Sequence, residues 1–247
     1  CSHFLDFEIT ESIELQFNIN SFTDTISCYG DSTGFINLDV LGGTPSYLFD
    51  LYNSDGLYSQ QTLNLFNNLP ADSYEIFVTD SLGCQDSLEV IINQNPLLQI
   101  IENLNLHEDV LCNGDTTGFI SLTIVGGDFN SQNSSFIHSY ENLIAGYYSY
   151  TFTDSSSCTM SIDSIQIAEP SDILISLNSL QNIDCFNSTG NVEIEVQGGV
   201  LPYTYSLNGL DTNLILVSNQ VVTLNNLIED NYTFSLSDAN SCIDSVN

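Results

Sequence analysis

Apolar and polar side chains alternate along many short stretches of the chain. Residues 35–40 read FINLDV, residues 74–78 read YEIFV and residues 148–152 read YSYTF, with bulky apolar side chains at every second position. A period of two predicts strands that bury one face. No stretch combines the helical spacing of apolar residues with capping residues, so we expect an all-β fold. The same pattern predicts further strands at 119–125, 192–196 and 232–236.

These strands recur in three similar sets, and each set lies between two cysteines. The opening cysteines are Cys28, Cys112 and Cys185, and the closing cysteines are Cys84, Cys158 and Cys242. Each closing cysteine precedes a further alternating stretch. Counting Cys1 as a closing position, the gaps from closing to opening cysteine are 27, 28 and 27 residues, whereas the gaps from opening to closing cysteine are 56, 46 and 57. The near-constant gap indicates a fixed structural path, and the variable gap indicates loops that tolerate deletion.

The repeats divide the chain into modules. We expect residues 1–10 to be the last strand of an upstream repeat, followed by repeat 1 (residues 11–94), repeat 2 (95–168) and repeat 3 (169–247). Repeat 3 stops early in its last strand, so both ends are expected to cut through a longer array. About 80 residues with short strands predict an immunoglobulin-like β-sandwich of roughly seven strands. No Gly/Ser linker separates the repeats, so tandem modules stacked end to end as a rod are expected.

The charge of the chain is unusual because all of it is acidic. There are 32 Asp and Glu residues, no Lys and no Arg, which gives a formal net charge of −32. Such a surface cannot neutralise phosphates, so nucleic acid and anionic membranes are poor partners. No apolar run approaches the ~18 residues that span a bilayer, so no membrane insertion is expected. Mutual repulsion of the carboxylates favours an extended arrangement over one compact globule.

The repeat motif resembles a known family. CYGDSTG from residue 28 and CNGDTTG from residue 112 open two repeats, GGTPSY from residue 42 and GGVLPY from residue 198 follow a strand, and YEIFVTDSLGC ends at residue 84. This order resembles the SprB-type repeat of cell-surface adhesins in gliding Bacteroidota. Repeat 2 departs from it with Asp128-Phe129 in place of the Pro-Tyr element, and repeat 3 lacks the Gly-Asp at its start.

The resemblance implies a function. It indicates a structural repeat segment of a large secreted adhesin filament that acts in gliding motility and surface attachment, without enzymatic activity. Its partners would be neighbouring repeats of the same long chain, an external surface or polysaccharide, and the motility machinery through other regions of the protein. The resemblance also implies export to the cell surface by the type IX secretion system. Two alternatives are a calcium-dependent carbohydrate-binding module and a structural protein of an S-layer or biofilm matrix.

Two disulfide pairings are open. Even pairing in an exported β-module predicts disulfides, and the simple version joins Cys28–Cys84, Cys112–Cys158 and Cys185–Cys242 within repeats. However, the opening and closing cysteines of a sandwich lie at opposite ends of strands longer than 20 Å, whereas a disulfide needs Cα atoms within about 7 Å. In a head-to-tail stack, Cys28 would instead meet Cys158 and Cys112 would meet Cys242. Cys1 and Cys185 would then have partners outside this chain. A lipidated Cys1 is a further alternative.

Acidic residues at the turns allow a metal site or a structural role. Asp31 and Asp115 follow an opening cysteine, and Asp80, Asp154 and Asp238 end the strand before a closing cysteine. Asp in such turns bonds its own backbone, which is the structural interpretation. The functional interpretation places Ca²⁺ at the junctions of repeats, with Asp31, Asp80, Asp115 and Asp154 as ligands. No other cofactor is expected.

Two further kinds of site were considered. Asp followed by Ser or Thr and then an apolar residue or Thr resembles the O-glycosylation sequon of Bacteroidota, with chance recurrence in an Asp- and Ser-rich chain as the alternative. The three histidines, His3, His107 and His138, are scattered and lack equivalents in the other repeats, so no Ser-His-Asp triad stands out. The candidate glycan acceptors are Ser32, Ser87, Thr116, Ser164 and Ser245.

Overall fold

The computed structural model describes residues 5–129, 135–185, 188–216 and 221–246. In these residues the regular structure is β, apart from one 3₁₀ turn, η1 (Leu104–Leu106). The chain divides into two compact units: unit 1 comprises residues 1–100, 124–136 and 151–160, and unit 2 comprises residues 101–123, 137–150 and 161–247. Repeat 2 therefore contributes residues to both units. Within the described part of the chain, no helix has the length and apolarity to cross a membrane.

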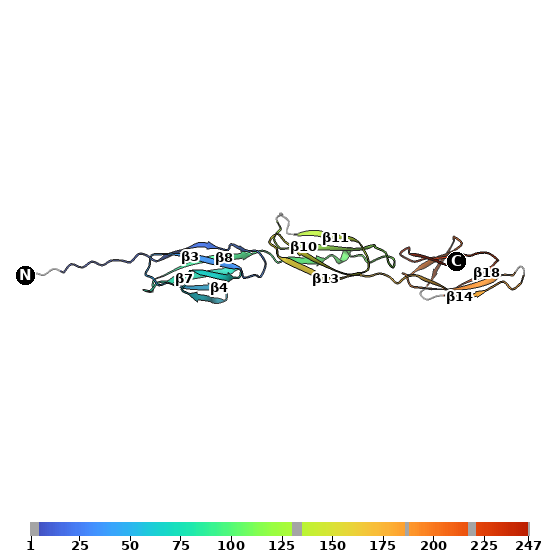
Figure 1. Cartoon of the computed structure of the whole chain (residues 1–247), viewed down its shortest axis with the longest axis horizontal. Helices are drawn as coiled ribbons and strands as arrows, with labels where there is room; N and C mark the ends of the chain where they lie inside the picture. Colours follow the sequence, from blue (N-terminus) through green and yellow to red (C-terminus); the bar gives the residue numbers. More distant parts are fainter. Residues whose placement is uncertain (1–4, 130–134, 186–187, 217–220, 247) are drawn as a thin grey trace, which may run out of the picture. The chain divides into compact units, whose positions relative to one another are not determined.

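Repeat 1 is a sandwich of two sheets, and β3, β4, β7 and β8 are labelled in Figure 1. The first sheet has the order β1-β3-β6, from β1 (Gln16–Phe22), β3 (Gly34–Leu41) and β6 (Leu65–Leu69). The second has the order β2-β8-β7-β4-β5, from β2 (Thr25–Ile26), β8 (Gln85–Gln94), β7 (Asp72–Thr79), β4 (Leu48–Asn53) and β5 (Gly56–Gln61). Strand β2 runs parallel to β8 and the other neighbours are antiparallel. This order is that of immunoglobulin strands A-B-E and A′-G-F-C-C′.

The core of repeat 1 follows from the alternation in its sequence. In β7, Tyr74, Ile76 and Val78 are fully buried, while Glu75 between them is exposed and Phe77 is only partly buried. Strand β3 of the opposite sheet and strand β4, which neighbours β7, add side chains to the same core from their own alternate positions. Each such burial contributes roughly 1.5–3 kcal/mol, so the period of two decides which face of each sheet points inward. These side chains are Ile36 and Leu38 from β3, and Phe49 and Leu51 from β4.

Repeat 3 has the same architecture. One sheet has the order β14-β15-β18, from β14 (Leu174–Gln181), β15 (Gly190–Gln197) and β18 (Val221–Leu227). The other has the order β17-β16-β19-β20, from β17 (Leu210–Leu216), β16 (Tyr203–Leu207), β19 (Phe234–Ser237) and β20 (Ile243–Val246). The strand expected at 232–236 begins later, at Phe234. Its core includes Ile194, Val196, Tyr203, Phe234 and Leu236.

Repeat 2 is shorter than the other two repeats. Its strands are β9 (Gln99–Glu102), β10 (Gly118–Val125), β11 (Ser135–Leu143), β12 (Gly146–Thr153) and β13 (Thr159–Ile167), in sheets β11-β10-β9 and β12-β13. Among its described residues, no strands correspond to the β4–β5 hairpin of repeat 1. The deletion inferred from the cysteine gap of 46 residues thus coincides with the place of a strand pair, rather than only of a loop. The stacking of repeats along an array stays a prediction.

Candidate functional site: the junctions between repeats

Two disulfides connect neighbouring repeats. Cys28 of repeat 1 is bonded to Cys158 of repeat 2, and Cys112 of repeat 2 is bonded to Cys242 of repeat 3. The Cα–Cα distance is 5.6 Å and the sequence separation is 130 residues in both bonds. The first bond lies inside unit 1 and the second inside unit 2.

Of the two pairings that the sequence left open, the pairing within repeats is wrong. The bonds Cys28–Cys84, Cys112–Cys158 and Cys185–Cys242 do not occur, because four of these cysteines are engaged elsewhere and Cys84 and Cys185 are free. The physical reason is the one given by strand length, since an opening and a closing cysteine of one sandwich lie at opposite ends of it. Cys1 lies outside the described residues.

Each closing cysteine sits in a loop organised by one aspartate. Asp154 accepts hydrogen bonds at Oδ1 from the backbone N–H groups of Ser156 (3.0 Å) and Cys158 (2.8 Å), and at Oδ2 from that of Asp128 (2.8 Å). Its side chain is buried. Burial raises the pKa of Asp154, but the three backbone donors outweigh it and hold the pKa below its usual range. The carboxylate thereby fixes the path of the loop that presents Cys158.

The same aspartate occurs in the other two repeats. Asp80 accepts from the backbone N–H groups of Thr44 (2.9 Å), Leu82 (2.9 Å) and Cys84 (2.8 Å). The hydrogen bond from Thr44 is the main reason why its pKa is lowered. Asp238 accepts equivalently from Val200, Asn240 and Cys242, each at 2.9 Å. The capping role considered for these residues is thus the one that the structure displays.

The two bonded opening cysteines, Cys28 and Cys112, each lie in a tight turn that is held by a distant side chain. Cys28 accepts at its carbonyl from the N–H of Asp31 (3.2 Å), and Gly30 donates its N–H to Oε1 of Gln94 (2.7 Å). Repeat 2 has the same bonds, because Asp115 donates to the carbonyl of Cys112 (3.1 Å) and Gly114 donates to Oε2 of Glu169 (2.8 Å). A side chain at the end of β8, or two residues after the end of β13, therefore holds the turn that carries each bonded opening cysteine.

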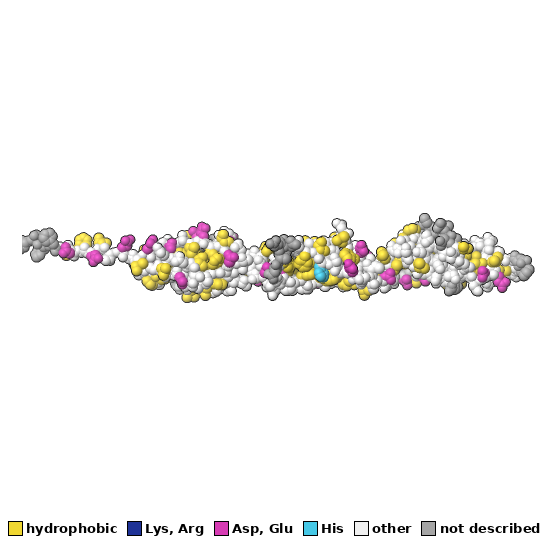
Figure 2. All heavy atoms as spheres, turned by 90° about the horizontal axis from the view of Figure 1, so that it is seen from above, with side chains coloured by type: hydrophobic (Ala, Val, Ile, Leu, Met, Phe, Trp, Pro, Cys, Tyr) yellow, Lys and Arg dark blue, Asp and Glu magenta, His cyan; other side chains and the backbone are white. Residues whose placement is uncertain are grey.

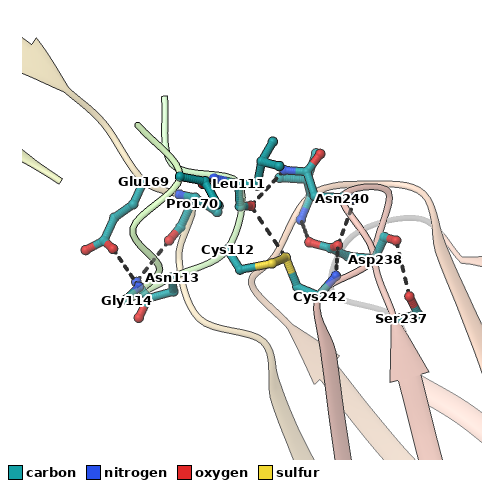
Figure 3. The surroundings of a disulfide bond; sticks show 12 residues. Leu111, Cys112, Asn113, Gly114, Glu169, Pro170, Ser237, Asp238, Asn240 and Cys242 are labelled. Atoms are coloured by element: carbon teal, nitrogen blue, oxygen red, sulfur yellow. Dashed lines mark hydrogen bonds between the residues drawn. A yellow bond between two sulfur atoms is a disulfide. The ribbon is translucent and has the colours of Figure 1, made fainter. Parts of the chain in front are cut away.

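The two loops also contact each other beside the disulfide, as Figure 3 shows for Cys112–Cys242. Cys242 Sγ lies 3.4 Å from the carbonyl oxygen of Leu111, and Asn240 Nδ2 donates a hydrogen bond to the same oxygen (2.8 Å). Asn113 Nδ2 donates to the carbonyl of Pro170 (3.0 Å), which begins the link to repeat 3. In the other junction Cys158 Sγ lies 3.4 Å from the carbonyl oxygen of Ser27. The disulfide is therefore one part of a larger contact between the opening turn and the closing loop.

The Gly-Gly pairs complete the junction, and the sequence did not reveal this role. The link that enters repeat 2 crosses the bend after β10 so closely that a Cβ on Gly126 would lie 1.9 Å from the carbonyl oxygen of Leu97. Gly127 donates its N–H to the carbonyl of Pro96 (2.9 Å). The apolar residue that follows, Leu98, is buried against the bend. Repeats 1 and 3 have the same arrangement around Gly42-Gly43 and Gly198-Gly199.

The candidate calcium ligands do not form a cluster among the described residues. The described residues contain no group of three or more His, Cys, Asp or Glu arranged to hold a metal ion. Asp31 and Asp115 are exposed, whereas Asp80 and Asp154 direct their carboxylates to backbone N–H groups. A hollow of about 350 Å³ beside Cys112–Cys242 is lined by three carboxylate residues, Asp115, Asp172 and Asp238. Calcium binding there stays a prediction.

The five candidate glycan acceptors are all exposed. Ser32 and Thr116 lie in the opening turns, and Ser87, Ser164 and Ser245 lie on β8, β13 and β20. A glycan could be attached at any of them without disturbing a core. Glycosylation itself stays a prediction.

One histidine has partners that the sequence did not indicate. In unit 2, His107 follows η1, and its Nδ1 lies 2.7 Å from Glu102 Oε1 while its Nε2 lies 3.3 Å from Asp109 Oδ1. Burial lowers the pKa of His107, but the hydrogen bonds and charges of Glu102 and Asp109 outweigh it and raise the pKa. Because both ring nitrogens face carboxylates, neither is directed at a serine, as a general base requires. His3 lies outside the described residues.

Taken together, the strand order and the junctions define a class: tandem immunoglobulin-like sandwiches covalently joined between neighbours. Within that class, residues 20–56 and 177–212 match the family model of the SprB repeat, so the chain contains SprB repeats. This match indicates a repeat of the cell-surface, adhesin type.

Comparisons with curated protein sequences and with solved structures give less information than the family model. No curated protein sequence matches the chain. Among solved structures, the chain is similar to the complex of Dpr2 Ig1-Ig2 with DIP-Theta Ig1-Ig3, at 8% identity and a TM-score of 0.33, covering 94% of this chain and 98% of that one. It is also similar to the eight N-terminal Ig domains of DSCAM, at 15% identity and a TM-score of 0.34, covering 97% of this chain and 36% of that one. The immunoglobulin-like assignment rests on the strand order.

Proposed function

We propose that this chain is a shaft segment of a surface adhesin filament, whose work is to transmit tension rather than to catalyse a reaction. The observation that carries the proposal is the pair of disulfides between repeats, Cys28–Cys158 and Cys112–Cys242. A bond inside a repeat protects only that repeat. A bond from the start of one repeat to the end of the next makes the covalent path bypass much of the folded chain.

The surrounding contacts support a mechanical role. The aspartate-capped loop, the opening turn and the link across the Gly-Gly bend meet at each junction, so rotation of the joined loops would break several hydrogen bonds at once. The hollow beside Cys112–Cys242 is lined by several polar and acidic residues, whereas most small-molecule sites are largely apolar. The junctions are therefore suited to holding neighbouring repeats together.

The surface chemistry is suited to an exported filament. Figure 2 shows acidic side chains dispersed over one face of the molecule, with hydrophobic side chains between them. The absence of Lys and Arg removes every trypsin cleavage site and leaves like charges along the whole chain. Neighbouring filaments would repel one another at low ionic strength. We propose that the filament serves gliding motility and attachment to external surfaces, and that it is exported by the type IX secretion system.

A display experiment separates a shaft from a binding module. The chain is placed between a cell-surface anchor and a bead-binding tag, and bead retention under flow is compared with that of a variant in which Cys28, Cys112, Cys158 and Cys242 are replaced by Ser. If the chain is a shaft, it holds the bead on a tether. The length of this tether should stay constant under flow in the oxidised parent chain and increase in the Ser variant. The proposal is contradicted if the untagged chain itself captures polysaccharide in a calcium-dependent manner and tether length does not depend on the cysteines.

A further inference from the structure

The sheet that contains β12 in repeat 2 has an open edge. Among the described residues, β12 pairs with β13 on one side and with no strand on the other. In repeat 1 the equivalent strand, β7, lies between β8 and β4, and in repeat 3 the equivalent strand, β19, lies between β20 and β16. Repeat 2 lies between two other repeats of the chain, so both of its neighbours are present. The three repeats therefore differ at one strand position, the one beside β12.

Three tyrosines align these strands residue by residue. Tyr74, Tyr148 and Tyr232 each donate a hydroxyl hydrogen bond to the carbonyl oxygen of the residue four positions earlier, at 2.9, 2.8 and 3.2 Å. A tyrosine with this bond marks the start of strand F in immunoglobulin-like sandwiches. Each of the three also lies six residues before the aspartate that caps the closing loop. The side chains two residues further on are Ile76, Tyr150 and Phe234.

Tyr150 is less protected than its two counterparts. Ile76 is fully buried and Phe234 is 2% exposed, whereas Tyr150 is only partly buried. Its ring stacks on that of Tyr140 from β11, with the ring centroids 3.9 Å apart. Its hydroxyl oxygen is buried and has no hydrogen-bond partner among the described residues. Since buried hydroxyls are nearly always paired, this part of repeat 2 lacks a polar group of the kind that an added strand brings.

Repeats 1 and 3 show which side chains fit beside this position. The residue directly opposite Ile76 is Leu51 of β4, and the residue directly opposite Phe234 is Leu207 of β16. Both strands run antiparallel to their neighbour, and both carry an aromatic residue two positions before this leucine. The pattern aromatic–x–Leu therefore fits the edge that β12 leaves open. The two aromatic residues are Phe49 and Tyr205.

The charge of the chain favours a basic strand as the occupant over a second copy. Residues 146–150 contain no charged side chain and no proline, which are devices that natural edge strands use against pairing. The chain as a whole has 32 acidic residues and no Lys or Arg, so two copies repel each other. A strand with Lys or Arg on its solvent-facing side is attracted by the same charge.

We infer that β12 of repeat 2 binds an extended segment of another protein by antiparallel strand addition, with an aromatic–x–Leu face directed to the core and basic side chains directed to solvent. In such additions the main-chain hydrogen bonds supply affinity and the alternate side chains supply specificity. The inference goes beyond the shaft proposal, because it gives repeat 2 a binding edge at the position that β4 and β16 fill in its neighbours.

The test uses a labelled peptide that copies β4 (Leu48–Asn53) with Asp50→Lys and Tyr52→Lys and a further lysine at each end. It is added to the full oxidised chain in about 0.15 M NaCl, and binding is followed by fluorescence anisotropy and by hydrogen exchange. We expect saturable binding, with exchange of the backbone N–H groups of residues 146–150 slowed about fivefold or more. The same peptide with Leu51→Ser should bind about tenfold more weakly, because it loses the buried leucine.

Charge changes at Ser149 test the register of the added strand. In repeat 1, Tyr52 lies directly opposite Glu75, the counterpart of Ser149, so the lysine that replaces Tyr52 in the peptide should lie opposite Ser149. Ser149→Glu should then tighten binding about threefold, and Ser149→Lys should weaken it about threefold. Thr233→Glu and Thr233→Lys are the matched controls, because they make the same charge changes at the equivalent position of repeat 3, where β16 fills the edge. Their effects should be smaller.

Four results would overturn the inference. These are unchanged exchange at residues 146–150, equal binding of the Leu51→Ser peptide, equal effects of the Ser149 and Thr233 changes, and slowed exchange at residues 146–150 that grows with chain concentration when no peptide is present. The second and third would show attraction by charge alone, and the fourth would assign the edge to a second copy. Each of them leaves the shaft proposal standing, because that proposal needs only the two internal disulfides.

Discussion

The overlapping disulfides set a limit on how far the chain can be extended, and this limit can be worked out from the connectivity. From Cys28 to Cys242 the backbone has 214 peptide links. Through the two bonds, the shortest covalent path runs from Cys28 to Cys158, back along 46 links to Cys112, and across to Cys242. At about 3.5 Å per residue, the fully stretched length is about 750 Å for the reduced chain and about 170 Å for the oxidised chain.

Removing one bond should give an intermediate length. With Cys112→Ser and Cys242→Ser, the path runs through Cys28–Cys158 and then along 84 links to residue 242. That is about 300 Å, and removal of the other bond should give the same value because the remaining path also has 84 links. Three separate lengths are thus expected from the parent chain, either double variant, and the reduced chain.

Single-molecule pulling measures these lengths directly. Enzymatic tags at the two ends of the chain attach it to a bead and a surface without using cysteines, and the increase in contour length is recorded on unfolding. Reduction should lengthen the unfolded tether of the parent chain by about 580 Å. An oxidised chain that extends as far as the reduced one would refute the connectivity and, with it, the tension path on which the proposed function depends.

Other perturbations test the parts of the junction. Gly126→Ala should lower the free energy of unfolding by more than about 2 kcal/mol, because the new Cβ would clash with the carbonyl oxygen of Leu97. Gly30→Ala should lower it by only about 1 kcal/mol, because Gly30 has a positive φ but open space around it. Urea unfolding of the two variants measures the difference. Asp154→Ala removes the acceptor of three backbone donors and should cost about 2–4 kcal/mol in the same assay. Because the pKa of Asp154 is lowered by folding, the parent chain should lose this contribution as pH falls through about 4 and below, while the variant should show a smaller acid dependence. The pKa of His107 is raised by folding, so its pH dependence is opposite to that of Asp154. Its stabilisation is present below about pH 6.5 and is lost as pH rises through the folded-state pKa. His107→Gln should remove this pH dependence from the melting temperature. If calcium binds beside Cys112–Cys242, the melting temperature should be higher in calcium than in EDTA at matched ionic strength, and equal melting temperatures would contradict the calcium prediction.

Much of the fold could be predicted because it depends on local pattern. Alternation placed the strands at 35–40 and 74–78 inside β3 and β7, and the strand at 192–196 inside β15. The capping role of the aspartates was also accessible, since an Asp in a turn bonds nearby backbone N–H groups.

The junctions depend on segments that are far apart in sequence, and these were harder to predict. Pairing of Cys28 with Cys158 requires knowing which loops meet in space, so two pairings remained open. The role of Gly126 as the crossing point of a link was missed because Gly-Gly also marks a simple bend. The pairing of Cys84 with Cys28 was one of these two alternatives, and Cys84 is free in the structure. His107 was treated as isolated because Glu102 and Asp109 approach it only through the turn at η1.

The span of each disulfide also dictates an order of events during biogenesis. Cys28 cannot find its partner until residue 158 exists and the closing loop of repeat 2 has folded, so its thiol must remain unoxidised while 130 further residues emerge. Premature oxidation would trap Cys28 with Cys84, the first thiol to follow it. Maturation of such a chain therefore requires either a reducing interval before export or an isomerase that rearranges wrong disulfides. The correct bond forms only after the neighbouring repeat has folded, so each disulfide depends on the folding of two repeats.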